Sequence, residues 1–265
     1  MRRIHLECAQ LSDKGMVRTF NEDNVLCDRE NGLFVLADGM GGYKAGDVAS
    51  SMAAQIIQQK IVQGGATSAD DSYESGLVNA IASANSQIYR AARLNRDFEK
   101  MGTTVVVAHF HDDVLSVAHV GDSRLYRMRR GKMEALTLDH SLLQEQITLG
   151  LISPEEARLS HNRNLVTRAL GAEGAVVVDT QRFAVEEGDI YLLCSDGLND
   201  MVNDEDIALA LSTLSIKLPL AAEILVQMAN DNGGHDNVSV ILIRASSQSV
   251  DKAGLTSRLF GWLKR

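Results

Sequence analysis

Segments typical of strands and segments typical of helices occupy separate blocks of this chain, and this separation limits the possible folds more than any other feature. Residues 4–37 are typical of short strands broken by turns, and residues 45–63 and 71–94 are typical of helices. Four short strand-like segments then follow one another: 103–110, 114–120, 124–128 and 133–138. Their short connections favour antiparallel hairpins, because a parallel pair needs a long crossover.

The second half of the chain alternates in the same way. Residues 139–171 are polar and irregular, and Ser153 and Glu156 form a capping-box pattern at one short helix start. Strands are expected at 176–183, 190–194 and 238–243, and helices at 204–212 and 218–230. Blocks of strands and blocks of helices predict one α+β domain with antiparallel sheets, over residues 1–245.

The composition excludes several classes of protein. The 265 residues are 45% hydrophobic and 23% charged, which is ordinary for a folded globular chain and excludes dominant disorder. Lys and Arg number 26 against 35 Asp and Glu, and the net charge of −9 argues against nucleic-acid binding. No run of about 18 apolar residues is present, so we expect no transmembrane segment.

Cysteine usage and the first residues of the chain favour a cytoplasmic protein. The 3 cysteines, Cys8, Cys27 and Cys194, have neither the even number of a disulfide framework nor the spacing of a zinc site. The first eight residues carry charge within their short apolar stretch, unlike a signal peptide. Residues 246–265 are predicted to be a linker and a short basic tail. We favour a frayed tail; the alternative is an amphipathic helix that contacts a partner or a membrane surface.

Five acidic clusters stand out from the rest of the sequence. Four place an Asp at a strand end or in a glycine-containing turn: Asp38-Gly39, Gly121-Asp122, Ser195-Asp196-Gly197 and Gly234-His235-Asp236-Asn237. The fifth is Asn21-Glu22-Asp23. A single Asp-Gly usually marks an ordinary turn. Several carboxylates that follow apolar strands would be costly to bury without a cation, and oxygen ligands favour Mg²⁺ or Mn²⁺ over zinc.

Six motifs, in this order, resemble those of the metal-dependent protein phosphatases of type 2C. They lie at 18–23 (RTFNED), 38–42 (DGMGG), 102–104 (GTT), 121–124 (GDSR), 195–198 (SDGL) and 236–239 (DNVS). Each motif alone is weak, but six in order over about residues 4–245 identify the chain as similar to a compact bacterial member. The resemblance implies a β-sandwich of two antiparallel sheets flanked by helices on both sides. It also implies a centre of two Mn²⁺ or Mg²⁺ ions at one edge of the sandwich.

The resemblance also implies roles for individual residues. Asp38 would bridge two metal ions, the carbonyl of Gly39 would bind one of them, and Asp196 and Asp236 would complete the other. Asp122 together with Asp196 resembles the third-metal site of bacterial members. Three further residues would act around these ligands: Glu22 through a metal-bound water, and Asp23 and Asn237 behind the ligands. Arg18 would bind the substrate phosphate, for which its forked guanidinium is well shaped.

The expected activity is hydrolysis of phosphoserine and phosphothreonine in proteins. Two ions would neutralise the repulsion between a phosphate and hydroxide and lower the pKa of a bridging water. Where some relatives carry a general-acid His, this chain has Met40, so the proton donor stays open between water and His161. Residues 139–171 correspond to the flap of the family, in which Arg163 and Arg168 are candidate contacts to the phosphoprotein.

Two further hypotheses belong to other functional classes. A catalytically silent module with the same fold would bind or sense phosphoproteins, but the retained Asp38, Asp196 and Asp236 favour activity. A Ca²⁺-binding protein is disfavoured, since no twelve-residue Asp-rich loop ending in Glu is present. The substrates are therefore expected to be phosphorylated Ser/Thr proteins, with a cognate Ser/Thr kinase as a partner. His119, within an apolar strand, is expected to be a core histidine with its hydrogen bonds satisfied.

Overall fold

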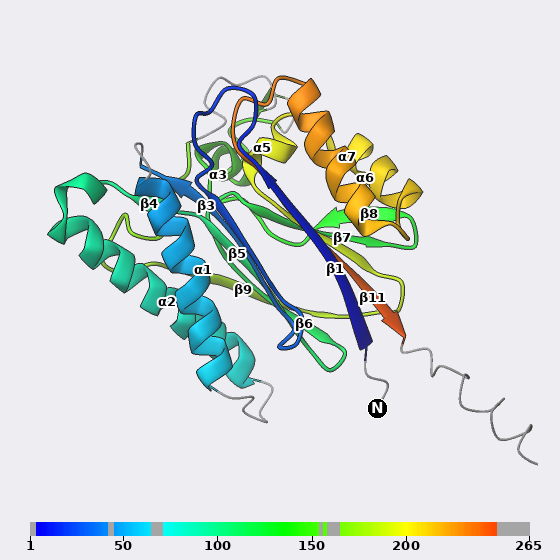
Figure 1. Ribbon diagram of the computed structural model, residues 1–265, viewed down its shortest axis with the longest axis horizontal. Helices are drawn as coiled ribbons and strands as arrows, with labels where there is room; N and C mark the ends of the chain where they lie inside the picture. The colour runs from blue at the N-terminus through cyan, green and yellow to red at the C-terminus, as the bar shows by residue number, and fades with distance from the viewer. Residues whose placement is uncertain (1–3, 42–44, 65–70, 154–155, 158–164, 248–265) are drawn as a thin grey trace, which may run out of the picture.

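The computed structural model describes residues 4–41, 45–64, 71–153, 156–157 and 165–247. Two antiparallel sheets stack face to face, and helices cover the outer face of each (Figure 1). The expected four-layer sandwich of an α+β fold is therefore confirmed. None of the helices in these ranges has the length and apolar character needed to cross a bilayer.

One sheet contains five strands, which come from the beginning, the middle and the end of the chain. Its order is β1-β11-β10-β7-β8, and every neighbouring pair is antiparallel. The strands are β1 (Ile4–Asp13), β7 (Arg124–Arg129), β8 (Lys132–Ala135), β10 (Ile190–Cys194) and β11 (Val238–Ser247). The pairing of β1 with β11 joins the two ends of the described chain over ten residue pairs, from Ile4↔Ser247 to Asp13↔Val238.

The other sheet has the order β2-β3-β5-β6-β9, with the short strand β4 paired to β3. The strands are β2 (Asp23–Asp28), β3 (Leu33–Met40), β4 (Gly102–Thr103), β5 (Val105–His111), β6 (Val114–Val120) and β9 (Asp179–Ala184). The strand β3 is central, and its end carries the Asp38-Gly39 motif. This sheet therefore delivers the first predicted metal ligand to the edge of the sandwich.

The helices lie in two groups on opposite sides of the sandwich (Figure 1). Helices α1 (Ala45–Gly64) and α2 (Asp71–Leu94) cover the β3 sheet, and α6 (Asp204–Thr213) and α7 (Leu218–Asp231) cover the β10 sheet. Three further short elements lie within the described ranges: η1 (Arg96–Phe98), α3 (Leu142–Thr148) and α5 (Asp196–Asn199). The capping box at Ser153 is confirmed, because the Glu156 carboxylate accepts the Ser153 N–H at 2.8 Å and Ser153 Oγ accepts the Glu156 N–H at 3.2 Å.

The core is divided into three layers by the alternation of side chains along the buried strands. On β3, Leu33, Val35 and Ala37 pack against α1 and α2, whereas Phe34 and Leu36 pack between the two sheets. A third apolar layer lies between β10, β11 and helices α6 and α7. Since both faces of β3 are buried, its apolar run is continuous rather than alternating.

The predicted elements agree closely with the observed ones, apart from three strand limits. The strand expected at 238–243 continues to Ser247, where it is still paired with β1. The strand expected at 133–138 ends at Ala135, and the strand expected at 176–183 begins only at Asp179. Val176 and Val178 pack against the α1–α2 core instead of joining the sheet. The edge strand β9 pairs with β6 only up to Asp179↔His119, so its preceding residues have no partner in that register.

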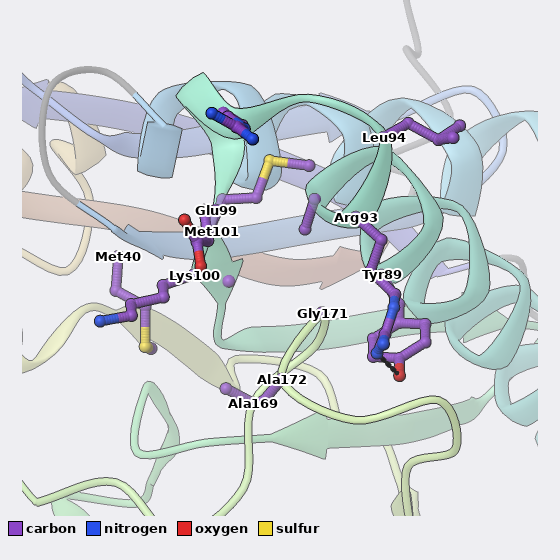
Figure 2. A pocket seen from close by; sticks show the side chains of 13 residues that line it. Met40, Tyr89, Arg93, Leu94, Glu99, Lys100, Met101, Ala169, Gly171 and Ala172 are labelled. Atoms are coloured by element: carbon purple, nitrogen blue, oxygen red, sulfur yellow. Dashed lines mark hydrogen bonds between the residues drawn. The ribbon is translucent and has the colours of Figure 1, made fainter.

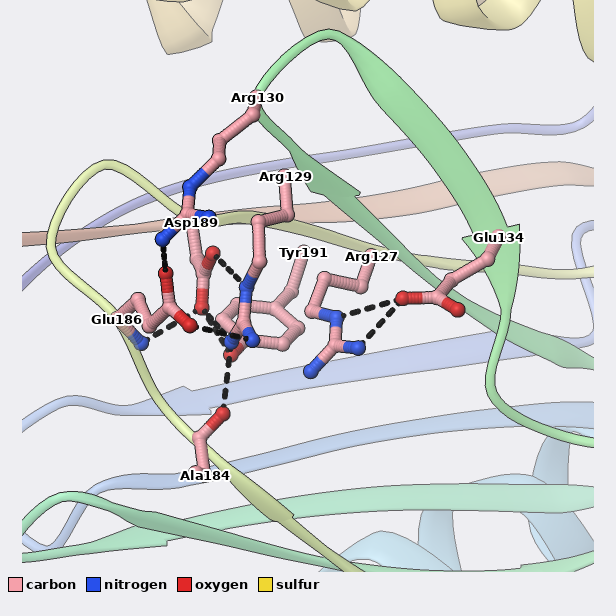
Figure 3. A network of polar contacts seen from close by, with 8 residues as sticks. All are labelled: Arg127, Arg129, Arg130, Glu134, Ala184, Glu186, Asp189 and Tyr191. Carbon is pink, nitrogen blue, oxygen red and sulfur yellow. Dashed lines mark hydrogen bonds and ion pairs between the residues drawn. The ribbon is translucent and has the colours of Figure 1, made fainter.

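A network of ion pairs links β7 to the turn between β9 and β10 (Figure 3). The carboxylate of Asp189, 1% exposed, receives two hydrogen bonds from Arg129 at 2.7 Å each and one from the Tyr191 hydroxyl at 2.9 Å. Burial alone would raise the pKa of Asp189, but the hydrogen bonds from Arg129 and from the Glu186 N–H hold it below its ordinary value. This pair therefore joins the end of β7 to the start of β10 within one sheet, and a further hydrogen bond from Arg129 to the carbonyl of Ala184, at 2.7 Å, reaches β9 of the other sheet.

Candidate metal centre

Four of the acidic clusters supply a carboxylate from the end of a strand or from the turn that follows. Asp38 lies in β3, two residues before its end, and Asp122 is in the turn between β6 and β7. Asp196 begins α5 shortly after β10, and Asp236 precedes β11. Asp23 begins β2 and is the direct cross-strand neighbour of Asp38. The sandwich thus brings residues that are up to about 200 positions apart to one edge, where strands of both sheets end.

The electrostatics of the site show that these carboxylates lie close together. Burial, followed by the charges of Asp23, Asp196, Asp122 and Asp236, raises the pKa of Asp38 well above its ordinary value. The pKa of Asp196 is also raised well above its ordinary value, first by burial and then by the charges of neighbouring carboxylates. Such mutual repulsion costs free energy, which a bound cation would offset.

Two oxygens in this cluster are buried without a hydrogen-bond partner. They are Oδ1 of Asp23 and Oδ1 of Asp196. The other oxygen of Asp23 accepts the hydroxyl of Ser195 at 2.9 Å. Burial raises the pKa of Asp23 to about 6, although the hydroxyls of Ser239 and Ser195 lower it. Orphaned carboxylate oxygens in an all-oxygen donor set fit a hard divalent cation such as Mn²⁺ or Mg²⁺.

A cavity of about 500 Å³ adjoins the cluster between α5, α3 and β7. Its acidic lining includes Asp122, Asp196 and Asp200. Asp200 was not identified in the sequence analysis, yet its charge raises the pKa of both Asp122 and Asp196, after burial as the main cause. Asp200 lies four residues after Asp196, so one helical turn places the two side chains on one face. That spacing was the available signal in the sequence, and the absence of a glycine beside Asp200 hid it.

A neighbouring carboxylate, Asp139, is already paired. Arg124 donates to both of its oxygens, with a closest distance of 2.7 Å. Asp139 lines the same cavity as Asp122 and still raises the pKa of that residue. Its bidentate partner makes Asp139 a weaker candidate for binding a metal than Asp200.

Arg18 lies at the exposed rim of the centre. Its guanidinium contacts Asp236 at 2.6 Å, and its side chain is 52% exposed. The backbone before it is fixed to the loop that precedes Asp236, because Met16 N–H donates to the carbonyl of Gly234 at 2.8 Å. Gly15, at φ +76°, permits this approach, since a Cβ there would lie 2.2 Å from the carbonyl oxygen of Asp236. The remaining donors of Arg18 are accessible at the rim.

Asn237 fastens the segment that carries Arg18. Its amide nitrogen donates to the carbonyls of Lys14 and Phe20, at 3.0 and 2.9 Å, and its amide oxygen accepts the N–H of Glu22 at 2.8 Å. The side chain is buried, so these hydrogen bonds are shielded from water. Asn237 therefore shapes the site through the loop 14–22.

Glu22 reaches the start of helix α1. Its Oε1 accepts the N–H of Gly46 at 3.1 Å, so it satisfies a donor at the helix N-terminus. The strand end and the helix approach very closely here, because a Cβ on Gly39 would lie 2.2 Å from the carbonyl oxygen of Gly46. Glycine at both positions thus allows Asp38, Gly39 and Glu22 to share one edge.

A second polar cluster lies behind the turn that carries Asp122. His119, His140 and Asp179 are, among the residues that the structure describes, the three whose potential ligand atoms all lie within 4.8 Å of one another. Both rings already have hydrogen-bond partners within the protein: His140 Nδ1 accepts the Gly121 N–H at 3.1 Å, and His119 Nε2 donates to the Leu138 carbonyl at 2.8 Å. The expectation of a hydrogen-bonded core histidine at 119 is confirmed.

The flap candidates are only partly placed. Arg168 pairs with Asp179 at 3.0 Å and lies 3.3 Å from His140 Nε2, so its guanidinium is engaged within the protein. His161 and Arg163 lie outside the described residues, as do Gly42 and the tail 248–265. Met40 follows Gly39 and pairs with Gly102 across β3 and β4.

Comparison with known proteins gives a consistent result. Residues 16–231 match the family described as Protein phosphatase 2C. The serine/threonine phosphatase stp of Listeria welshimeri is 39% identical over 238 residues, which are 88% of this chain and 93% of that protein. The crystal structure of the Mycobacterium tuberculosis serine/threonine phosphatase PstP/Ppp matches with a TM-score of 0.84 and 36% identity, covering 92% of this chain and 99% of that one.

A further solved structure contains metal. The catalytic domain of the serine/threonine protein phosphatase PstP in complex with 2 manganese ions has a TM-score of 0.81 and 35% identity, and the match covers 92% of this chain and 100% of that one. Manganese is a metal that the oxygen-rich donor set described above would favour.

Proposed function

Because the chain belongs to the Protein phosphatase 2C family, we propose that it is a metal-dependent phosphatase of phosphoserine and phosphothreonine in proteins. The observation that carries this proposal is the group of buried carboxylates with unpartnered oxygens beside an exposed arginine. A cluster of this kind binds divalent cations, and the arginine adds a site for phosphate at its rim. The manganese complex of a relative supports the choice of cation.

In this proposal the ligands form a centre for two metal ions and a separate site for a third ion. Asp38 and the carbonyl of Gly39 would bind the first two ions together with Asp196 and Asp236, and Glu22 would act through water. Asp122 and Asp196 would bind the third ion, and Asp200 is added to that pair because its charge acts on both of them. When bound, such ions neutralise phosphate charge and lower the pKa of a coordinated water.

Three residues around the proposed metal ligands have separate roles in binding the substrate, orienting a ligand and protonating the leaving group. Arg18 presents its free donors to the phosphate oxygens while Asp236 holds one end of its guanidinium. Asp23, with its pKa of about 6, lies behind Asp38 and keeps that carboxylate oriented through their cross-strand pairing. Met40 carries no exchangeable proton, so the alkoxide leaving group takes its proton from another donor, either water or His161.

The proposed activity is tested with an aryl phosphate and purified protein. We expect turnover with Mn²⁺ and none after chelation. Asp38→Asn and Asp236→Asn should each reduce the rate by at least about 100-fold with an unchanged circular dichroism spectrum, because each removes a proposed ligand. Asp113→Asn, in an exposed hairpin turn, is the matched control and should keep the wild-type rate. Metal-independent turnover, or a ligand variant with the wild-type rate, would contradict the proposal.

The silent binding module is the other outcome of this experiment. It predicts phosphoprotein binding without turnover at any Mn²⁺ concentration. The complete set of acidic residues in the described site supports turnover, since binding alone does not require buried carboxylates that repel one another.

We also propose a setting for this activity. The protein acts in the cytoplasm of a bacterium, in signalling, and reverses the reaction of a cognate Ser/Thr kinase. The catalytic domain spans residues 1–245 with a flap at about 139–171; because β11 continues through Ser246 and Ser247, the linker and tail expected at 246–265 begin after Ser247. The names of relatives as serine/threonine phosphatases support the substrate class. Phosphoproteomics after deletion would test it by showing which phosphosites accumulate.

A further inference from the structure

A second cavity, of about 810 Å³, adjoins the end of β3 (Figure 2). It is enclosed by the last turn of α2, the segment 96–102 and the segment 169–172, and Met40 forms part of its wall. None of the proposed metal ligands lines it. Its closeness to the metal centre follows from the strand pairing, because Gly39↔Thr103 and Met40↔Gly102 join β3 to β4.

The residue that follows Gly102 of the cavity wall is hydrogen-bonded to the proposed bridging ligand. Thr103 Oγ1 donates to the carbonyl of Asp38 at 2.8 Å, and Asp38 precedes Met40 by only two residues. Two strand residues span about 7 Å. An extended peptide whose phosphoresidue is at the metal centre can therefore place a side chain two to four residues away in this cavity.

The charges around the cavity have the sign opposite to that of the metal centre. Arg93, Arg96 and Lys100 line it, with Glu99 as the acidic residue. In a chain with a net charge of −9, this is a local concentration of positive charge. Arg93, Arg96 and Lys100 are all exposed. Within the part of the chain that the structure describes, none of these three side chains forms an ion pair with a carboxylate.

The cavity is shaped before any ligand binds. The guanidinium of Arg93 lies over the ring of Tyr89, 5.1 Å from its centroid, and donates to the Tyr89 hydroxyl. Lys100 has φ +68°, which places its side chain at a tight turn that an L-residue adopts only when the surroundings hold it. The turn packs closely on the residue that follows β3, because a Cβ on Gly41 would lie 2.9 Å from Cα of Met101.

We propose that this cavity binds a second anionic side chain of the phosphoprotein, namely an Asp, a Glu or another phosphorylated residue near the scissile phosphate. The inference rests on the proposed function and adds a sequence preference to it. Arg96 and Lys100 attract the anions that flank a phosphosite, at a position that the proposed metal ions do not occupy. Substrates with a flanking negative charge on the correct side are therefore the preferred ones.

The experiment compares matched phosphothreonine peptides that carry Glu or Ala three residues before or after the phosphothreonine. For the wild type, kcat/KM should be about three- to tenfold higher for the Glu peptide on one side, which is the size expected of a few exposed charge pairs. The preference should shrink as ionic strength rises. The double variant Arg96→Ala/Lys100→Gly should lose it, and glycine is well suited to the positive φ of residue 100.

Arg130→Gly is the matched control. Arg130 is also a basic residue at positive φ in a turn, with φ +51°, but it pairs with Glu186 and does not line the cavity. This variant should keep the peptide preference. Turnover of an aryl phosphate, which has no flanking residues, should be unchanged in both variants. The inference would be overturned if the double variant kept the wild-type preference or if the wild type showed no preference. It would also be overturned if the double variant lost as much turnover of aryl phosphate as of the Glu peptide.

A second readout separates this inference from the proposed function. If the wild type does not hydrolyse the aryl phosphate with Mn²⁺, the proposed function fails. Fluorescence anisotropy of the same peptides in EDTA still tests the cavity, because it needs no turnover. Tighter binding of the Glu peptide by the wild type and by Arg130→Gly, but not by the double variant, supports the cavity; equal binding by all three refutes it.

Discussion

Replacement of Asp122 with Asn should make the metal-free protein more stable. Asp122 is 6% exposed, and it faces other carboxylates in the cavity between α5 and β7. Its negative charge is therefore unfavourable until a cation is bound. Asn has almost the same shape but no charge, so the substitution removes the repulsion while the packing is kept.

The magnitude follows from the pKa of this group. Burial and the charge of Asp139 raise the pKa of Asp122 from its ordinary 3.8 to about 6. At about 1.4 kcal/mol per pH unit, the ionised carboxylate destabilises the folded state by about 3 kcal/mol above pH 6. We therefore expect Asp122→Asn to increase the free energy of unfolding in EDTA at pH 7 by about 2 to 3 kcal/mol.

The pH dependence of this difference has a definite sign. A carboxyl group whose pKa is raised by folding binds more protons in the folded state, so its destabilising effect appears as pH rises through the window from 3.8 to about 6. The difference between Asp122→Asn and the wild type should thus be largest at pH 7 and close to zero near pH 4. Taking the difference between the two proteins removes the contributions of other titrating groups.

Urea unfolding, followed by circular dichroism, measures the effect with and without Mn²⁺. The wild type should gain about 2.7 kcal/mol when Mn²⁺ is present at 100 times its Kd, and the variant should gain less because it lacks one ligand. Asp113→Asn in the exposed turn is the control and should change neither value. An Asp122→Asn protein that is less stable than the wild type in EDTA at pH 7 would refute the reasoning.

Three other substitutions test separate parts of the structure. Arg18→Ala should raise KM for a phosphopeptide at least about tenfold and leave Tm unchanged, because the side chain is half exposed; a lower Tm with unchanged KM would indicate a structural role. Asn237→Ala should lower the free energy of unfolding by about 1 to 3 kcal/mol and raise KM, since it releases the Arg18 loop; a wild-type urea midpoint would contradict this. Asp189→Ala should destabilise the fold by about 3 kcal/mol in urea without changing KM, because it leaves Arg129 without its buried partner; a change in KM alone would be unexpected.

Much of the fold could be predicted because the relevant signals are local. The strand 114–120 and the helices over 45–63 and 71–94 follow from apolar periodicity and agree with β6, α1 and α2. The strand expected at 176–183 begins only at Asp179, for a reason that apolar periodicity cannot reveal. Val176 and Val178 are apolar enough for a strand, but the edge of the sheet leaves them without a partner.

The histidines of β5 show the same limit. The alternation of residues along a strand predicts that His109 and His111 share one face, and the turn residues Asp112 and Asp113 beside them predict a solvated hairpin end. The two histidines do share a face, and both rings pack on Tyr73, at centroid distances of 5.5 and 3.7 Å. The solvated environment was wrong for His109, which is 8% exposed, and burial lowers its pKa to about 4. The helix α2 that covers it comes from another part of the chain.

The aspartates of the site were recognisable one at a time, whereas their convergence was not. Sequence alone determined that Asp38, Asp122 and Asp196 come at the ends of apolar runs, because an apolar run and the turn residues beside it are neighbours in the sequence. Only the packing of two sheets decided that these carboxylates meet, that Asp200 joins them and that Asn237 fastens the loop of Arg18. Those relations depend on distances between segments far apart in the chain, and such distances are set by the packing of the whole core rather than by any local pattern.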